Sequence, residues 1–410
     1  MERYDVVIVG GGIAGGALAT RLARAGVGVL VLEKQAAYRD MVRGETFQPW
    51  GVGEVRALGL EQTLLDAGGG WAHVTVNYDE RVSPEEAEAD ALPSAGLVPG
   101  VEGSLNVGHP EACEALTSAA AVAGATVVRG VGAVAIEPRR VTYTDAAGVD
   151  HVADCRLIVG ADGRHSVVRK RAGFTLTERA PTHFGAGLLV EGLQDWPEDR
   201  DAIGTGSDAL YLVFPRPGGR ARLYLMWDIA DQHRFTGADR EHAFLDSYRF
   251  DGCPGSEELA KATPAGPYAG YPMTDGIVDR FVDDGVVLVG DAAGWNDPVI
   301  GQGLSISMRD VRSVADVLLA SEDWSPSSFG GYIEERTERM RRLVIEAKVF
   351  TQIRATFGPA ADRRRMAYRE SMMTDPSAFA LVAGVAMGPE TIPAETFADA
   401  EIERLLSLGA

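Results

Sequence analysis

A glycine-rich turn near the start of the chain is the strongest chemical signal in the sequence. Residues 10–15 read GGGIAG, which fits the pattern G-x-G-x-x-G, and they follow the β-branched run YDVVIV directly. Gly10 permits a tight turn, Gly12 lets backbone amides approach a pyrophosphate without a Cβ in the way, and Gly15 lets a helix pack close to the strand. The phosphates then lie at the positive end of that helix. The motif therefore predicts a dinucleotide site.

The elements around this turn form one βαβ unit. Residues 4–9 read as a strand, an alanine- and leucine-rich stretch to about Ala25 reads as a helix, and residues 27–32 read as a second strand. That strand ends at Glu33, near the spacing of about 20 residues expected for a carboxylate that binds a ribose diol. Such a carboxylate disfavours a 2′-phosphate, so FAD or NAD fits better than NADP.

Two later segments also place glycine and an acid after a buried-strand run. Residues 160–169 read GADGRHSVVR, and residues 290–303 read GDAAGWNDPVIGQG. Ligands of open α/β sheets bind at the carboxyl ends of the strands, so all three segments are expected to face one ligand. Gly301 and Gly303 leave bare amides at the start of a helix that we expect near Leu304. A helix N-terminus there would stabilise negative charge on a bound group.

Composition and charge exclude several other classes of protein. The chain has 410 residues, 46% hydrophobic residues and a formal net charge of −20, which argues against binding to nucleic acid. Its three cysteines are widely spaced and its seven histidines form no ligand pattern, so we expect neither a disulfide framework nor a metal site. No apolar run reaches the roughly 18 residues of a membrane span. The first strand begins too early to leave room for a signal peptide, and we expect a cytoplasmic protein.

The middle of the chain has a different pattern. Residues 185–191, 209–214 and 221–228 read as strands of an antiparallel sheet, and the PRPGG segment at 215–219 predicts a turn. From about Gly303 onwards the chain reads mostly as helix. The predicted fold class is α/β, with a dinucleotide domain of the Rossmann type built from separated pieces and an antiparallel β-sheet domain inserted between them. Residues 1–75, 101–178 and 276–345 are assigned to the first domain, 76–100 and 179–275 to the second, and 346–410 to C-terminal helices.

Over about residues 4 to 315 the chain resembles the single-component FAD-dependent aromatic hydroxylases, of which para-hydroxybenzoate hydroxylase is the type. The matching motifs are the glycine turn, Asp162-Gly163, Gly290-Asp291 and Arg43 in an R-G-E segment. The resemblance implies a glutathione-reductase-like FAD domain in which Asp291 binds the ribityl side of FAD. It also implies that Asp162-Gly163 serves FAD and a transient nicotinamide cofactor, and that residues 298–303 lie along the flavin ring. The predicted cofactor-binding positions are Gly10, Gly12, Ile13, Ala14, Gly15, Glu33, Lys34, Arg43, Asp162, Gly163, Asp291, Pro298, Gly301, Gly303 and Leu304.

The sequence departs from the pattern of that family near the expected flavin. His109-Pro110 stands where many relatives have an arginine, Ser305 stands where asparagine is common, and residues 294–297 (GWND) replace the usual His-Pro-Met-Leu. The flavin-proximal candidates for catalysis are Trp295, Asn296, Asp297 and Pro298, with no catalytic role assigned. The predicted substrate pocket holds Tyr211, Tyr224, Met226 and Trp295, although such residues are also ordinary core. A base for a phenol is sought at His183, Tyr211, Tyr224 or Asp228, each of which also suits a packed sheet.

The resemblance implies a monooxygenase that uses NAD(P)H and O2 to hydroxylate or epoxidise an electron-rich aromatic or polycyclic small molecule through a flavin C4a-hydroperoxide. A flavin-dependent halogenase is one alternative, suggested by Asp297-Pro298, but the chain lacks the G-W-x-W-x-I-P segment. A reductase or oxidase of the geranylgeranyl-reductase type and a non-enzymatic flavin-binding regulator are the others. The choice of NADH or NADPH, the substrate, and monomer or homodimer stay open.

Overall fold

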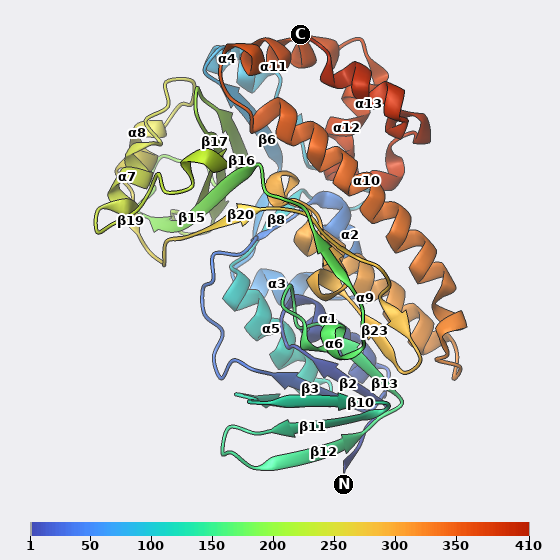
Figure 1. The fold of residues 1–410 in the computed structure, drawn as a ribbon. Coiled ribbons are helices and arrows are strands. Elements are labelled where there is room, and N and C mark those ends of the chain that lie inside the picture. Colours follow the sequence, from blue (N-terminus) through green and yellow to red (C-terminus); the bar gives the residue numbers. More distant parts are fainter. Residues whose placement is uncertain (1, 410) are drawn as a thin grey trace.

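The first lobe of the molecule is built on a mainly parallel sheet. In the computed structural model, which describes residues 2–409, this sheet occupies the lower half of the view (Figure 1). Its strand order is β22-β23-β13-β2-β3-β9, and every pair is parallel except β22–β23. The strands are β2 (Val6–Val9), β3 (Val29–Glu33), β9 (Thr126–Arg129), β13 (Leu157–Gly160), β22 (Val282–Asp283) and β23 (Val286–Leu288).

These strands are apolar runs because both faces of a parallel sheet are covered. The sequences VVIV, VLVLE and LIVG are buried throughout. One layer of helices consists of α1 (Ile13–Arg24), α5 (His109–Val122) and α9 (Gly303–Ala320), in which α1 packs against both α5 and α9. Below this sheet lies a small one, β1 (Glu2–Arg3), β12 (Asp150–Asp154), β11 (Arg140–Thr144) and β10 (Val134–Glu137) (Figure 1).

The second lobe is a larger sheet with strand order β19-β15-β18-β17-β16-β6-β7, and β20 also pairs with β15. The strands predicted at 185–191, 209–214 and 221–228 correspond to β15, β17 and β18, and these pair antiparallel. The strands are β6 (Val74–Asp79), β7 (Leu92–Pro93), β15 (His183–Glu191), β16 (Arg200–Thr205), β17 (Leu210–Arg216), β18 (Arg220–Asp228), β19 (Thr263–Pro264) and β20 (Ala269–Met273).

One ladder in this sheet is parallel, which the sequence did not predict. Strand β16 pairs in parallel with β6, a segment that leaves the first lobe early in the chain. The sequence of β16, RDAIGT, begins with two charged residues and contains a glycine, so it lacks the β-branched run that marks its neighbours.

The two faces of this sheet pack against different partners. Tyr211 and Val213 share one face with Leu223 and Leu225, as the alternation predicts, and α7 (Arg240–Asp246) and α8 (Ser256–Ala260) contribute to that core. Leu210, Leu212, Tyr224 and Met226 point the other way, into a cluster shared with the C-terminal helices.

The C-terminal part is helical, as expected, but its first helix crosses the expected domain boundary. Helix α10 runs unbroken from Gly330 to Arg354, so the division at 345/346 falls inside one element; likewise 75/76 falls inside β6. Three further helices follow, α11 (Pro359–Ser371), α12 (Pro376–Met387) and α13 (Asp399–Leu406). They lie at the top of Figure 1, beside the upper end of α10. Within residues 2–409 no helix combines the length and the apolar character that a membrane crossing needs.

Short elements join these parts. The helices are α2 (Pro49–Ala57), α3 (Glu61–Asp66), α4 (Pro84–Ala89) and α6 (Val167–Arg171). The strands are β4 (Thr46–Phe47), β5 (Gly70–Ala72), β8 (Ser104–Asn106), β14 (Leu176–Glu178), β21 (Gly276–Val278) and β24 (Gly294–Trp295). Single turns of 3₁₀ helix include η2 (Gly290–Ala293) and η3 (Pro298–Ile300).

Candidate functional site

The glycines of the turn have different surroundings, because two pack against backbone and one faces open space. Gly10 has φ +101°, and a Cβ there would overlap the carbonyl of Ala161 on the neighbouring strand. A Cβ on Gly15 would overlap the carbonyl of Gly10, so these two glycines let β2, β13 and α1 come together. By contrast, a Cβ on Gly12 would meet no described atom within 4 Å. Gly12 therefore faces a space in which a ligand can approach the first amides of α1.

Glu33 lies beside this turn, as its position at the end of β3 predicts. Its carboxylate is buried and accepts the backbone N–H of Gly11 at 2.7 Å and that of Gln35 at 2.8 Å. The Tyr38 hydroxyl donates to the Gly11 carbonyl at 2.6 Å. A carboxylate has about four lone-pair sites, so acceptor capacity remains for a ribose diol. Lys34, the next residue, is exposed.

The second and third motifs meet each other in space. Arg164 donates from Nε to Asp291 Oδ2 at 3.2 Å, and its guanidinium lies 5.1 Å from the centre of the Trp295 ring. Arg169 donates from Nη1 to the Ala292 carbonyl at 3.0 Å. Gly290, with φ +59°, makes the turn that presents Asp291. The segments 160–169 and 290–303 therefore meet each other, and each approaches the glycine turn, Ala161 at Gly10 and Gly290 at Ala14.

The Asp162 side chain makes hydrogen bonds within the protein at the start of α6. Its carboxylate accepts from the hydroxyl of Ser166, the N-cap residue of α6, at 2.5 Å and from the backbone N–H of Val167 at 2.6 Å. Direct contact between Asp162 and a cofactor stays a prediction. Gly163, with φ +73°, would carry a Cβ that meets no described atom within 4 Å.

The segment 297–303 ends in an uncovered helix N-terminus. The Asp297 carboxylate accepts the backbone N–H of Val299 at 3.0 Å and so caps η3, and Gly301 then turns the chain with φ +62°. Helix α9 begins at Gly303, where a Cβ would meet no atom of residues 2–409 within 4 Å. Its first N–H groups are thus available to an electron-rich ligand atom.

Gln302 fixes this segment from behind. It is fully buried, accepts the indole N–H of Trp50 at 2.7 Å, and donates from Nε2 to the carbonyls of Ile300 (3.1 Å) and Val385 (3.0 Å). The backbone of 300–303 is therefore held between α2 and α12.

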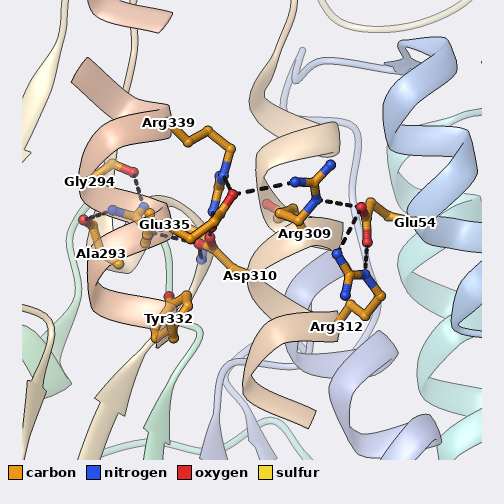
Figure 2. Close-up of polar contacts among 12 residues, drawn as sticks. Glu54, Ala293, Gly294, Arg309, Asp310, Arg312, Tyr332, Glu335 and Arg339 are labelled. Carbon is orange, nitrogen blue, oxygen red and sulfur yellow. Dashed lines mark hydrogen bonds and ion pairs between the residues drawn. The ribbon is translucent and has the colours of Figure 1, made fainter. Parts of the chain in front are cut away.

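A buried ion network holds the turn at Asp291, and sequence reasoning missed it. Asp310 on α9 accepts the backbone N–H of Gly290 at 2.8 Å and is paired with Arg336 Nε (3.0 Å) and Arg339 Nη2 (2.6 Å), both on α10. Arg336 also donates to the carbonyls of Ala293 (2.8 Å) and Gly294 (3.0 Å). Figure 2 shows the network continuing through Glu335 and Arg309 to Glu54 and Arg312. A polar Asp310 among the buried residues of an amphipathic α9 was the only available signal.

The loop that carries Arg43 is tied to the large sheet. The Tyr224 hydroxyl donates to the Arg43 carbonyl at 2.5 Å, and Arg222, fully buried on β18, pairs with Asp40 (2.5 Å) and Glu45 (2.8 Å). Burial raises the pKa of the Tyr224 phenol well above its ordinary value. The Arg43 side chain itself is exposed.

The predicted pocket residues separate into two groups. Tyr224 and Met226 belong to an apolar cluster that also holds Trp50, Val299 and Ile300, so they lie on the sheet face next to segment 297–303. Tyr211 lies in the core on the opposite face, with its ring stacked on Phe250 (5.1 Å) and edge-on to Tyr248 (5.4 Å).

The prediction that Tyr211 shares a pocket with Tyr224 is therefore wrong. Tyr224 lies opposite Leu212 in the pairing of β17 with β18, and Tyr211, the residue before Leu212, points to the other face of the sheet. Of the other candidates, Trp295 is buried, with its ring over Gly276 and below Arg164, and Asn296 donates to the Asp297 carbonyl at 2.9 Å. His183 is fully buried beside Asp297, whereas Asp228 is exposed.

Comparison with known proteins decides the family. The sequence profile described as "FAD binding domain" matches residues 3–347. The ubiquinone hydroxylase UbiL of Rhodospirillum rubrum is 31% identical over 346 residues, which cover 78% of this chain and 73% of that protein. The chain belongs to the FAD-dependent monooxygenase family. The expected mixed α/β FAD-binding fold is confirmed with it.

Other similar proteins have names that describe different activities. The 3-amino-4-hydroxybenzoate 2-monooxygenase of Streptomyces cremeus is 25% identical, with 76% of this chain and 78% of that protein covered. A chlorinase and a digeranylgeranylglycerophospholipid reductase are also 25% identical. The crystal structure of Pseudomonas aeruginosa PqsL in complex with 2-aminobenzoylacetate shares the fold, with a TM-score of 0.73, 22% identity, and coverage of 94% of this chain and 99% of that one.

The residues at the three motifs fit FAD. Gly12, Gly163 and Gly303 each leave the space that a side chain would fill, and they come from three distant segments. The partly exposed Asp291 carboxylate and the N-termini of α1 and α9 add an acceptor and two sets of donors in the first and third of these segments. Amides that point at a phosphate and a helix end that faces an electron-rich ring are the contacts this cofactor needs.

Proposed function

We propose that this protein is a monooxygenase that uses FAD, NAD(P)H and O2 to hydroxylate or epoxidise a small electron-rich aromatic or polycyclic compound. The observation that carries the proposal is the uncovered N-terminus of α9 at Gly303 beside an apolar sheet face. A helix N-terminus supports negative charge on a bound flavin, and an apolar face suits an aromatic ring and excludes water. FAD, once bound, supplies the transfer of electrons to O2 and of an oxygen atom to the substrate.

The residues of this chain position that chemistry. Asp291 and the amides at Gly12 and Gly303 hold the cofactor, while Tyr224 and Met226, with Val299 and Ile300, line the side on which a ring would lie. In this proposal the lobe of residues 76–100 and 179–275 binds the substrate. The sequence contains only one G-x-G-x-x-G turn. NAD(P)H is therefore proposed to bind transiently next to the flavin rather than in a second Rossmann site.

The names of similar proteins support an aromatic substrate. One relative is named for its action on 3-amino-4-hydroxybenzoate, and PqsL was crystallised with 2-aminobenzoylacetate. Both compounds contain an aromatic ring with an amino group. Aminobenzoates are therefore the first compounds to test, followed by phenols and polycyclic compounds.

The test is anaerobic reduction of the FAD-loaded protein by NADH or by NADPH, with and without each compound. The proposal expects that an aminobenzoate or phenol accelerates flavin reduction and that admission of O2 then yields an oxygenated product. Reoxidation that produces only hydrogen peroxide with every compound would argue against it.

A halogenase is the second candidate, because Asp297-Pro298 suggests that group and a chlorinase is among the relatives, although the chain lacks the G-W-x-W-x-I-P segment. It predicts a chloride-dependent product when a flavin reductase supplies reduced flavin. A C=C reductase instead predicts turnover without O2. The same assay with chloride added, and with O2 removed, therefore separates the three.

A further inference from the structure

Three titratable side chains from three segments meet where the flavin-lining segment begins. His183 is the first residue of β15, Asp275 lies between β20 and β21, and Asp297 immediately precedes η3. His183 Nε2 lies 3.2 Å from Asp297 Oδ1, and Asp275 Oδ1 accepts the backbone N–H of Asp297 at 2.7 Å. Their exposed fractions are 0%, 8% and 8%. Buried titratable groups in contact are rarely structural accidents, because each needs a partner.

The contact between His183 and Asp297 is electrostatic rather than a well-aligned hydrogen bond. Within residues 2–409 the Nε2 atom of His183 finds no acceptor with hydrogen-bond geometry, although Asp297 Oδ1 is near. Asp297 Oδ1 already accepts the backbone N–H of Val299, and His183 Nδ1 lies 3.2 Å from the Thr182 hydroxyl. The buried imidazole of His183 therefore faces the carboxylate of Asp297 directly.

Asp275 adds a second carboxylate to the same cluster. Burial raises the pKa of Asp275; the backbone N–H of Asp297 opposes that rise, and the Asp297 carboxylate adds to it. Arg179 Nη1 lies 3.5 Å from Asp275 Oδ2 on the solvent side, with about half of its side chain exposed. Two buried carboxylates, one buried imidazole and one half-exposed arginine therefore lie within one group of contacts.

The other elements packed against His183 bring little charge. Its register partner on β18 is Asp228, which is exposed, and its partner on β20 is the apolar Met273. Arg164 approaches the same segment from the other side, but it lies over the Trp295 ring and pairs with Asp291. The charge state at the start of the segment is therefore set by His183, Asp275 and Asp297.

We propose that His183, Asp275 and Asp297 form a proton-holding cluster that couples protonation to reduction of the bound flavin. The inference rests on the proposed placement of residues 298–303 along the flavin ring. FAD bound here would accept the two electrons of NAD(P)H, and its reduced form would carry one negative charge. Two carboxylates near the flavin would disfavour that charge, so the cluster would take one proton from solvent when the flavin is reduced. His183 and Asp297 are positioning residues in this scheme, because the flavin alone exchanges electrons.

The first test is independent of the flavin reaction. We would record the imidazole signals of the oxidised holoenzyme by NMR over pH 5 to 9, with His183 assigned from the His183→Gln variant. Asp297→Asn is expected to lower the proton affinity of His183 by at least about tenfold, because it removes the facing charge. An unchanged His183 titration in Asp297→Asn would overturn the proposal.

The chain offers a matched control in a second His–Asp pair. His151 Nε2 lies 2.8 Å from Asp145 Oδ2, on the small sheet and partly exposed. Asp145→Asn is expected to shift only the His151 titration and to leave the flavin unaffected. A change of the flavin potential in Asp145→Asn equal to that in Asp297→Asn would show a general charge effect and overturn the proposal.

The second test is the pH dependence of the flavin midpoint potential, measured by dye equilibration without NAD(P)H or substrate. If one extra proton is taken up on reduction, the equilibrium constant for reduction changes by a further factor of ten per pH unit. For this two-electron couple the midpoint potential then falls by about 30 mV more per pH unit. The wild type is expected to show this steeper slope over the pH range in which His183 titrates, and His183→Gln is expected to lose it. Asp275→Asn serves as the second variant if His183→Gln does not fold.

Equal slopes in the wild type, His183→Gln and Asp275→Asn would overturn the coupling, even if the NMR titration behaves as expected. Neither readout depends on an organic substrate. Failure of this inference is therefore distinct from failure of the proposed monooxygenase activity.

Discussion

At the residue scale, the glycine turn shows how one motif serves two purposes. The glycines at 10 and 15 are required by close backbone packing, whereas Gly12 leaves open space. The sequence pattern alone assigned the packing roles of Gly10 and Gly15 correctly, because the strand–turn–helix geometry of a βαβ unit leaves little freedom. The approach of a pyrophosphate to Gly12 stays a prediction.

A pair of alanine substitutions separates the two roles. Gly12→Ala is expected to fold normally and to bind FAD at least about tenfold more weakly, because the new methyl group occupies the space of the pyrophosphate. Gly15→Ala is expected to lose about 1–3 kcal/mol or more of stability, because its Cβ would overlap the Gly10 carbonyl. Thermal unfolding of the apoprotein and FAD titration measure the two effects. Equal FAD affinity in Gly12→Ala and the wild type would contradict this assignment.

Glu346 is a second residue whose environment makes a sharp prediction. It is fully buried on α10, and neither carboxylate oxygen has a hydrogen-bond partner among residues 2–409. Burial raises its pKa well above the ordinary value. Because the pKa is raised in the folded state, the stability contribution is complete below the unfolded pKa of about 4.3 and is lost as pH rises.

Glu346→Gln keeps the shape and removes the titration. It is therefore expected to become more stable than the wild type as pH rises from 5 to 8, by up to about 1.4 kcal/mol per pH unit. Urea unfolding at each pH measures the difference. The control is Glu338→Gln on the same helix, where hydrogen bonds from Arg341 and then Arg342 lower the pKa of Glu338 to about 2, so no change with pH is expected over this range. A constant difference for Glu346→Gln would contradict the account.

At the element scale, α9 and α10 act together to shape the Asp291 turn. The Asp310 carboxylate accepts the backbone N–H of Gly290, and Arg336 donates to the carbonyls of Ala293 and Gly294. Figure 2 shows Asp310, Ala293 and Gly294 in this network. Both helices come later in the sequence than the turn at residues 290–294, which they hold in place.

Removing the acid at the centre of this network is expected to be costly. Asp310→Asn leaves Arg336 buried without a counter-charge and Arg339 paired only with the partly exposed Glu335. Breaking a buried ion network in this way costs about 3–5 kcal/mol, and FAD affinity should fall with it. Asp316→Asn on the same helix removes only an exposed pair with Arg312 and should cost less than about 1 kcal/mol. Chemical unfolding of both variants measures the contrast. Similar losses in the two would show that the network does not hold the turn.

The same elements show what the sequence could and could not predict. The βαβ unit and the two later acid motifs follow from local patterns, so their strands and turns were predicted well. The Asp310–Arg336–Arg339 network joins residues on separate helices, and single-sequence periodicity carries no information on which charges will meet. Strand β16 was missed for its unfavourable composition, and its parallel pairing with β6 depends on a contact between distant segments.

At the scale of the whole molecule, the site is assembled from pieces spread over the chain. The family profile ends at residue 347, yet Gln302 in the flavin-lining segment donates to Val385 on α12. The C-terminal helices are therefore part of the support of the site, although sequence reasoning treated them as a separate segment. The negative net charge is not an obstacle to an anionic cofactor, because the local donors are backbone amides at two helix ends.

The central claim is that the FAD held at this site transfers an oxygen atom from O2 to an aromatic compound. The most direct measurement is mass spectrometry of products formed from an aminobenzoate or phenol by the FAD-loaded protein, with NAD(P)H and isotopically labelled dioxygen. The account predicts a product that carries one labelled oxygen atom for each NAD(P)H oxidised in coupled turnover, and loss of that product in Gly12→Ala. Product oxygen derived from water, or flavin turnover with no labelled product from any compound of either class, would contradict it.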